Sequence, residues 1–204
     1  MIAGLILAAG ESSRMGTDKA LLTYRGRTFI ETNLATLREA GVTRLVVVLG
    51  RHADEIQRAV DFKGVDVIVN HHYRQGQTSS LQAGLKALDS GAGMSLEAVL
   101  LCLVDHPAVP AEVVSALIAA FRATRPPVVI PTFKGQRGHP VLIGRALFDE
   151  LLGLSPEAGA NSIIRKYRNA TQFVEVGDAG ILLDVDDPET YRSLARPGGS
   201  FSSA

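Results

Sequence analysis

The chain has one cysteine, no tryptophan and no excess of charge of either sign, and these absences exclude several classes of protein. A single cysteine cannot form a disulfide within the chain, which excludes a disulfide-stapled secreted fold and favours a reducing cytoplasm. Lysine plus arginine and aspartate plus glutamate number 21 each, so no net field attracts nucleic acid or an anionic membrane. No apolar run approaches the roughly 20 residues of a membrane span, and no basic export signal precedes the first apolar stretch.

The remaining composition predicts one folded unit. With 204 residues, 46% of them hydrophobic, the chain can bury a substantial core. We expect a single domain at residues 1–195, and we expect the small, polar segment 196–204 to be a disordered tail. Cys102 stands within an apolar run, so it is expected to be a small buried side chain rather than a nucleophile.

Apolar runs alternate with amphipathic segments along the chain, which is the pattern of a parallel, doubly wound α/β sheet. A run at residues 138–143 follows a basic turn and is expected to return antiparallel, giving a mixed sheet. Ligands bind beyond the carboxyl ends of the strands in such sheets. The other strands are expected at residues 2–7, 45–49, 65–69, 98–104, 128–131 and 173–176, and the helices at 28–40, 54–60, around 81–88, 111–123, 145–152 and 161–167.

A glycine-containing loop follows the first predicted strand. Gly10 and Gly16 allow the backbone conformations that turn N–H groups inward around an anion. Arg14 and Lys19 add two positive charges, and two serines stand between the glycines. An ordinary surface turn is the alternative, but glycines, hydroxyls and cations gathered in one short loop indicate a polyphosphate site.

A second polar segment follows the third predicted strand and leads into a helix. Gly76 is followed by three hydroxyl residues, Thr78, Ser79 and Ser80. Thr78 or Ser79 is a natural N-cap, and hydroxyls at a helix N-terminus also contact a phosphate or a base edge. Both roles stay open. The adjacent histidines at 71–72 do not predict zinc, because neighbours on an extended segment point in opposite directions and a third ligand is missing.

Carboxylates appear after two further predicted elements. Asp105 ends the most apolar strand, where it is placed to ligate Mg²⁺ above the sheet. It is not needed to cap the next helix, because Pro110 opens that helix better. Near the C-terminus, Asp184, Asp186 and Asp187 either cap a helix or supply a second ligand to the metal.

His139 lies in the returning strand, in the sequence Gly-His-Pro-Val at residues 138–141. It either contacts substrate or is a structural histidine whose hydrogen bonds are satisfied inside the protein. The sequence favours neither role.

Five motifs in order resemble one known family. Residues 7–19 read Leu-Ala-Ala-Gly-x-Ser-x-Arg-Met-Gly-x-x-Lys, and residues 76–84, 105–107, 138–141 and 184–189 follow in the same order as in the MobA-like NTP transferases. Within that family the chain is most similar to the molybdenum cofactor cytidylyltransferase branch. The resemblance implies a three-layer, Rossmann-like fold of the glycosyltransferase-A type with a mostly parallel mixed sheet.

The resemblance also implies a reaction: Mg²⁺-dependent transfer of CMP from CTP to the terminal phosphate of a molybdenum-pterin cofactor, with release of pyrophosphate. Lys19, Arg14 and Asp105 would be catalytic, Asp105 and Asp186 would hold the metal, and His139 would lie near the acceptor. Asp184 is a weaker metal candidate. The implied nucleotide-binding residues are Leu7, Ala8, Ala9, Gly10, Arg14, Gly16, Lys19, Gly76, Thr78, Ser79 and Ser80.

The choice of nucleotide depends on small differences between branches. Leu-Ala-Ala-Gly, the hydroxyl segment and Gly-His-Pro-Val favour CTP, whereas Asp18-Lys19 resembles the guanylyl pattern. The alternatives are a GTP-dependent enzyme, a nucleotidyltransferase for a sugar phosphate or methylerythritol phosphate, and a molybdenum cofactor carrier without turnover. A dehydrogenase and a P-loop NTPase are excluded because their glycine signatures are missing. A molybdenum hydroxylase or its maturation protein is the expected partner.

Overall fold

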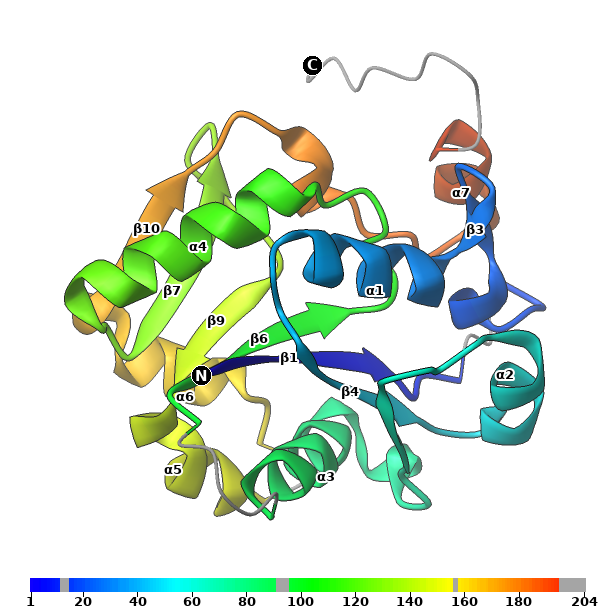
Figure 1. The fold of residues 1–204 in the computed structure, drawn as a ribbon, viewed down its shortest axis with the longest axis horizontal. Coiled ribbons are helices and arrows are strands. Elements are labelled where there is room, and N and C mark those ends of the chain that lie inside the picture. The colour runs from blue at the N-terminus through cyan, green and yellow to red at the C-terminus, as the bar shows by residue number, and fades with distance from the viewer. Residues whose placement is uncertain (12–14, 91–95, 156–157, 195–204) are drawn as a thin grey trace.

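The computed structural model describes residues 1–11, 15–90, 96–155 and 158–194, and an eight-stranded sheet forms its centre (Figure 1). The strands lie in the order β10-β7-β9-β6-β1-β4-β5, with β8 paired to β7. β9 is antiparallel to β6 and β7, while the other pairs along this order are parallel. The predicted mixed, mostly parallel sheet is therefore confirmed. The strands are β1 (Ile2–Ala8), β4 (Arg44–Leu49), β5 (Asp66–Val69), β6 (Ala98–Leu103), β7 (Val128–Phe133), β8 (Gln136–Arg137), β9 (Val141–Gly144) and β10 (Thr171–Glu175), and β2 (Thr23–Tyr24) pairs with β3 (Arg27–Thr28) in a separate ribbon.

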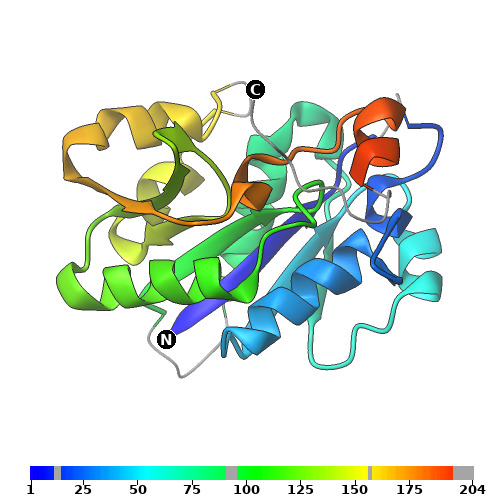
Figure 2. The same cartoon turned by 90° about the horizontal axis from the view of Figure 1, so that it is seen from above.

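Helices cover both faces of the sheet, which gives three layers (Figure 2). Alternate side chains of β1 enter two separate cores, Ile6 on one face and Leu5 on the other. The first core includes apolar residues of α1, α2 and α4, and the second includes those of α3, α5 and α6. The helices are α1 (Phe29–Glu39), α2 (Ala53–Ala59), α3 (Gln77–Asp89), α4 (Ala111–Thr124), α5 (Phe148–Leu152), α6 (Asn161–Lys166) and α7 (Pro188–Leu194).

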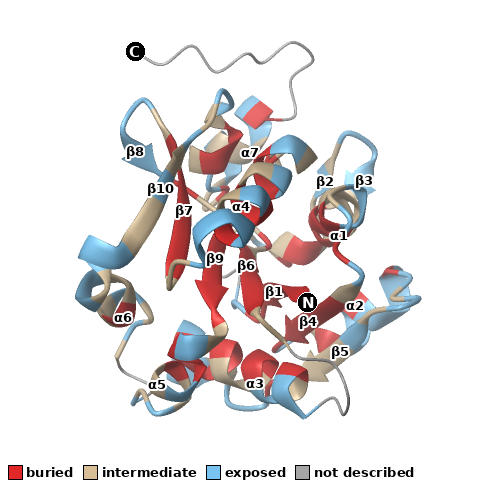
Figure 3. Cartoon of the chain, turned by 60° about the vertical axis from the view of Figure 1, so that its left-hand side comes forward, coloured by how far each residue is buried: buried red, intermediate tan, exposed pale blue. Residues whose placement is uncertain are grey.

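The central strands are buried on both faces, as Figure 3 shows, while the helices turn their exposed sides outward. This burial explains why the strands read as continuous apolar runs and the helices as amphipathic segments. Among the residues that the structure describes, none of the helices is both long and apolar enough to cross a membrane. The predicted tail, residues 196–204, lies outside the described residues.

Two helix starts differ from the prediction. The N-cap of α3 is Gly76, so the prediction of Thr78 or Ser79 as the cap is wrong. Gly76 has a φ of 99°, which favours glycine, and this conformation lets the helix begin two residues earlier. At α1, Thr28 is the cap rather than the first helical residue, and it forms a capping box with Glu31 that the sequence analysis did not identify.

Candidate active site

A pocket of about 360 Å³ opens at the carboxyl-terminal edge of the sheet. This volume falls within the range of small-molecule sites. The end of β1, the end of β6, the 3₁₀ turn at Lys19 and the start of α3 form its walls, and Asp186 joins them from the C-terminal segment. The lining residues are Leu7, Ala8, Ala9, Gly10, Glu11, Met15, Asp18, Lys19, Tyr73, Gly76, Gln77, Ser80, Leu103, Val104, Asp105 and Asp186.

Lys19 forms the charged centre of this pocket. Its Nζ donates to Asp105 Oδ2 at 2.9 Å and also to Asp186 Oδ1. Burial of Lys19 disfavours its charged form, but the hydrogen bonds and charges of Asp186 and Asp105 outweigh that effect and raise the pKa of the lysine. Lys19 therefore carries a fixed positive charge inside the pocket at neutral pH.

The backbone around Lys19 is held by Asp18, a residue to which the sequence analysis gave no role in the site. The Asp18 carboxylate accepts from the backbone N–H of Ala20 at 2.9 Å and thereby caps the turn Lys19–Leu21. Its other oxygen lies 3.1 Å from His52 Nδ1. Burial raises the pKa of Asp18, although the Ala20 hydrogen bond and His52 act in the opposite direction. A buried aspartate before the lysine thus fixes the turn from which Lys19 projects.

Residues 181–187 cross the carboxyl edge of the sheet and bring the distant aspartates to the pocket. The backbone N–H of His139 donates to the Ile181 carbonyl at 3.0 Å, and the N–H of Val185 donates to the Asp105 carbonyl at 3.0 Å. Gly138 lies so close to Ile181 that an added Cβ would sit 2.4 Å from the Ile181 oxygen. These contacts fix the position of Asp186 relative to Lys19 and Asp105.

Ligand atoms able to hold a cation gather at the same place. Asp105, His106 and Asp184 each offer one atom, and these atoms all lie within 4.8 Å of one another. The buried Nδ1 of His106 has no hydrogen-bond partner among the described residues. Carboxylate oxygens suit Mg²⁺, whereas an added imidazole is better tolerated by softer divalent ions such as manganese or zinc. The structure brings Asp184 into this group together with Asp105, while Asp186 bonds Lys19.

The predicted nucleotide-binding residues divide into two sets. Gly16, Thr78 and Ser79 do not line the pocket, and Arg14 lies outside the described residues. Thr78 Oγ1 donates to the Ala158 carbonyl at 2.8 Å, which turns it toward the loop before α6. The members that line the pocket are Leu7, Ala8, Ala9, Gly10, Lys19, Gly76 and Ser80.

His139 lies beside the pocket rather than in its wall. It lines a much smaller adjoining void with His106, and the two ring centroids are 4.8 Å apart. Burial first, and the neighbouring His106 second, lower the pKa of His139 to about 4. The ring is therefore neutral at physiological pH and can act by hydrogen bonding but not by charge.

Several pocket residues were not among the predicted site residues. Glu11, Asp18, Tyr73 and Gln77 line the pocket. Asn70 does not line it but donates to Ser79 and to Ser80, and Ser80 is a pocket residue. Asn70 follows β5 directly, so the rule that functional residues follow strands would have pointed to it.

Comparison with known proteins identifies the family. Residues 4–171 match the family described as the MobA-like NTP transferase domain. The chain belongs to this family. As a MobA-like NTP transferase it is a nucleotidyltransferase, and the fold and the enzyme class expected from the five motifs are confirmed.

Its relatives include enzymes with different names. It is 31% identical to nicotine blue oxidoreductase of Paenarthrobacter nicotinovorans, over 95% of this chain and 96% of the relative. It is 38% identical to a probable molybdenum cofactor guanylyltransferase of Opitutus terrae, over 63% of this chain and 59% of the relative. It is 23% identical to the molybdenum cofactor cytidylyltransferase of Escherichia coli, over 92% of each chain.

The crystal structure of Rv0371c from Mycobacterium tuberculosis is similar across almost the whole length. The TM-score is 0.82 with 30% identity, covering 95% of this chain and 97% of that one. The same mycobacterial protein is also known as a complex with manganese, with a TM-score of 0.79 and 27% identity over the same shares of the two chains.

Proposed function

We propose that this MobA-like NTP transferase transfers CMP from CTP to the terminal phosphate of a molybdenum-pterin cofactor and releases pyrophosphate. In this reaction an oxygen of the acceptor phosphate bonds to the α-phosphorus, and the bond from that phosphorus to the β-phosphate breaks. Such transfers depend mainly on positioning and on neutralising charge. They need no covalent nucleophile from the protein.

The observation that carries the proposal is the charged lysine between two carboxylates at the carboxyl edge of the sheet. Lys19 contacts Asp105 and Asp186, and the pocket beside them extends to the glycine of the first loop and the start of α3. A fixed ammonium group there would stabilise the negative charge that develops on the α-phosphate and the leaving pyrophosphate. The backbone near Ala9 and Gly10 would support the nucleotide.

The carboxylates are suited to hold a divalent cation. Asp105 together with Asp186 or Asp184 would bind Mg²⁺, which supplies charge neutralisation between phosphates and protein when bound. His106 belongs to the same cluster, so Mn²⁺ is a reasonable second metal to test. A pure carrier has no evident need for a lysine held between two carboxylates.

CTP is the proposed nucleotide on the basis of the Leu-Ala-Ala-Gly loop and the hydroxyl segment at Thr78–Ser80. The relatives support either base, because both a cytidylyltransferase and a guanylyltransferase are among them. Delivery to a molybdenum hydroxylase or to its maturation protein, in the cytoplasm, would complete the proposed role.

Pyrophosphate release by the purified protein tests the proposal. The protein would be incubated with Mg²⁺ or Mn²⁺ and with CTP, GTP, ATP or UTP in turn, each with and without the molybdenum-bearing pterin. Release with CTP only when the pterin is present is the expected result. Release with GTP instead would overturn the choice of base.

If no nucleotide gives pyrophosphate release, a binding measurement distinguishes the alternatives. If CTP still binds, another phosphate acceptor is indicated, whereas no nucleotide binding at all indicates a carrier. Because one full-length relative is named an oxidoreductase, a parallel arm would follow oxidation of NADH or NADPH with a dye acceptor. Turnover there without any pyrophosphate release would overturn the proposed reaction class.

A further inference from the structure

Asn70, directly after β5, organises the serines at the start of α3. The side chain is buried, at 6% exposure, and its Oδ1 accepts from the backbone N–H of His72 at 2.9 Å. This bond fixes which end of the amide is oxygen, because a backbone N–H can only donate. The amide nitrogen therefore faces Ser79 and Ser80, with each Oγ 2.9 Å away.

The direction of these two bonds determines the role of each hydroxyl. An amide nitrogen has two hydrogens to donate and accepts none, so both serine oxygens must act as acceptors toward Asn70. Ser79 then gives its own proton to the Gly76 carbonyl at 2.8 Å or the His72 carbonyl at 3.1 Å. The Ser79 proton is thereby donated within the protein and is not available to a ligand.

Ser80 differs from Ser79 in one respect. Its oxygen accepts from Asn70 with one of its two lone pairs, and its proton has no acceptor among the residues that the structure describes. Ser80 also lines the main pocket, although it is 3% exposed. A buried donor without a partner is unfavourable, and the pocket is where a ligand atom can accept this proton.

We infer that Asn70 is a positioning residue that commits the Ser80 hydroxyl to donate to the bound nucleotide. The inference rests on the proposed nucleotide site. It means that the nucleotide atom facing Ser80 is an acceptor, either a carbonyl oxygen or ring nitrogen of the base or an oxygen of the phosphates. A nucleotide presenting an N–H at this point would leave the Ser80 proton without an acceptor and would bind more weakly.

The inference is tested by replacing the donating amide nitrogen of Asn70 with an oxygen that accepts. In Asn70→Asp, both side-chain oxygens accept, so the serines must turn their protons toward residue 70 and Ser80 presents a lone pair to the pocket. Binding of CTP with Mg²⁺ would be measured by calorimetry for wild type, N70D, Ser80→Ala and the double variant. Ser90→Ala, an exposed serine at the other end of α3, is the matched control.

We expect S80A to weaken CTP roughly tenfold, and N70D to weaken it at least as much, as for a lost or opposed buried hydrogen bond. In the S80A background, N70D should have a much smaller effect, because only its added charge remains. If the two losses multiply instead, Asn70 does not act through Ser80 and the inference fails. S90A should bind CTP like wild type.

A second ligand and a second variant complete the experiment. Inorganic tripolyphosphate locates the acceptor: a loss with S80A for both ligands indicates a phosphate oxygen, and a loss for CTP alone indicates the base. If N70D does not fold, Asn70→Ala replaces it and should again lose most of its effect in the S80A background. Wild type that binds no nucleoside triphosphate would overturn the proposed function as well, whereas tight binding with independent losses would overturn this inference alone.

Discussion

At the scale of single residues, the site combines charged side chains that are partly buried, and burial strengthens the interactions between them. Lys19 is 13% exposed in its side chain, and its partner Asp105 is 21% exposed. Charges in such surroundings interact more strongly than on the open surface. The lysine and the aspartate before it therefore offer two direct tests.

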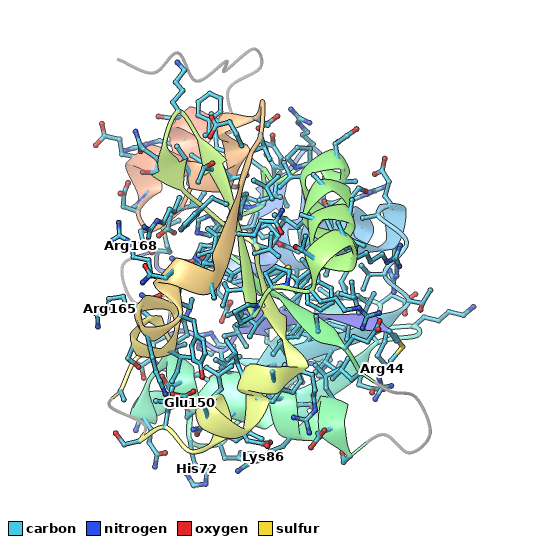
Figure 4. All side chains as sticks on the ribbon, turned by 90° about the vertical axis from the view of Figure 1, so that its left-hand side faces the viewer. Arg44, His72, Lys86, Glu150, Arg165 and Arg168 are labelled. Atoms are coloured by element: carbon cyan, nitrogen blue, oxygen red, sulfur yellow. The ribbon has the colours of Figure 1, made fainter. Side chains whose placement is uncertain are left out.

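Replacing Lys19 by alanine should lower kcat by roughly 10²–10³-fold, the loss seen when one preorganised charge donor is removed from a transition state. KM for the acceptor should change much less. Steady-state pyrophosphate release would measure both constants. Lys86→Ala is the control, because Lys86 is exposed on α3 at the edge of the molecule (Figure 4). An unchanged kcat with weaker nucleotide binding alone would contradict the catalytic role.

Asp18 should make stability depend on pH. Burial raises its pKa above the ordinary value of 3.8, so the folded state holds this proton more tightly than the unfolded state. That contribution to stability is present below pH 3.8 and is lost as pH rises through the raised pKa. Asp18→Asn keeps a cap acceptor but removes the charge.

The free energy of unfolding of Asp18→Asn, relative to wild type, should therefore increase as pH rises from 3.8 through the raised pKa of Asp18. Urea titrations at several pH values would measure it, with the exposed Asp149→Asn as control. A relative stability that falls over this range would show that His52 and the cap outweigh the burial of the charge.

At the scale of elements, the site depends on how closely residues 181–187 approach the strand edge. Gly138 leaves no room for a Cβ, since one would lie 2.4 Å from the Ile181 carbonyl oxygen and 2.7 Å from the Ile181 side chain. The same segment hydrogen bonds to Asp105 through Val185. Packing at this one glycine thus controls where Asp184 and Asp186 lie.

Gly138→Ala should destabilise the protein by about 1–3 kcal/mol, as overpacking does, and should reduce turnover by moving the two aspartates. Chemical denaturation and Mg²⁺ titrations of activity would measure the two effects. Gly177→Ala is the control, because an added Cβ there meets nothing within 4 Å. If Gly138→Ala loses stability but keeps full activity at saturating Mg²⁺, residues 181–187 keep their position in the variant and the predicted effect on turnover is wrong.

At the scale of the whole molecule, the lone Cys102 lies on the central strand β6, 5% exposed. Burial raises the pKa of its thiol to about 12. The prediction that it is a buried apolar side chain is confirmed. Its position makes it a reporter of opening of the core, because the thiolate is the reactive form.

Ellman's reagent at pH 8 should label no thiol in the native protein and one thiol per chain in strong denaturant. Between these limits the labelling rate should follow the global free energy of unfolding, as expected for a group on a central strand. Absorbance during a denaturant series would measure it. Rapid labelling under native conditions would mean that β6 opens locally.

The sequence by itself determined the order of the longer strands and helices along the chain, the antiparallel return and the edge of the sheet at which the pocket opens. These features depend on local patterns: apolar runs, helical spacing, and residues that follow strand ends. It also identified Lys19, Asp105 and Ser80, all of which line the pocket.

Only the tertiary structure decided what these residues touch. Lys19 meets carboxylates 86 and 167 residues away, and a local pattern carries no information on contacts across such separations. The burial of Asp18 beside His52 and the displacement of His139 from the pocket follow from packing between distant elements. Asn70 follows a strand end and could have been noticed from the sequence. The direction of its hydrogen bonds could not, because it depends on three nearby groups, the His72 N–H and the Ser79 and Ser80 hydroxyls, whose relative placement is set by the fold between β5 and α3.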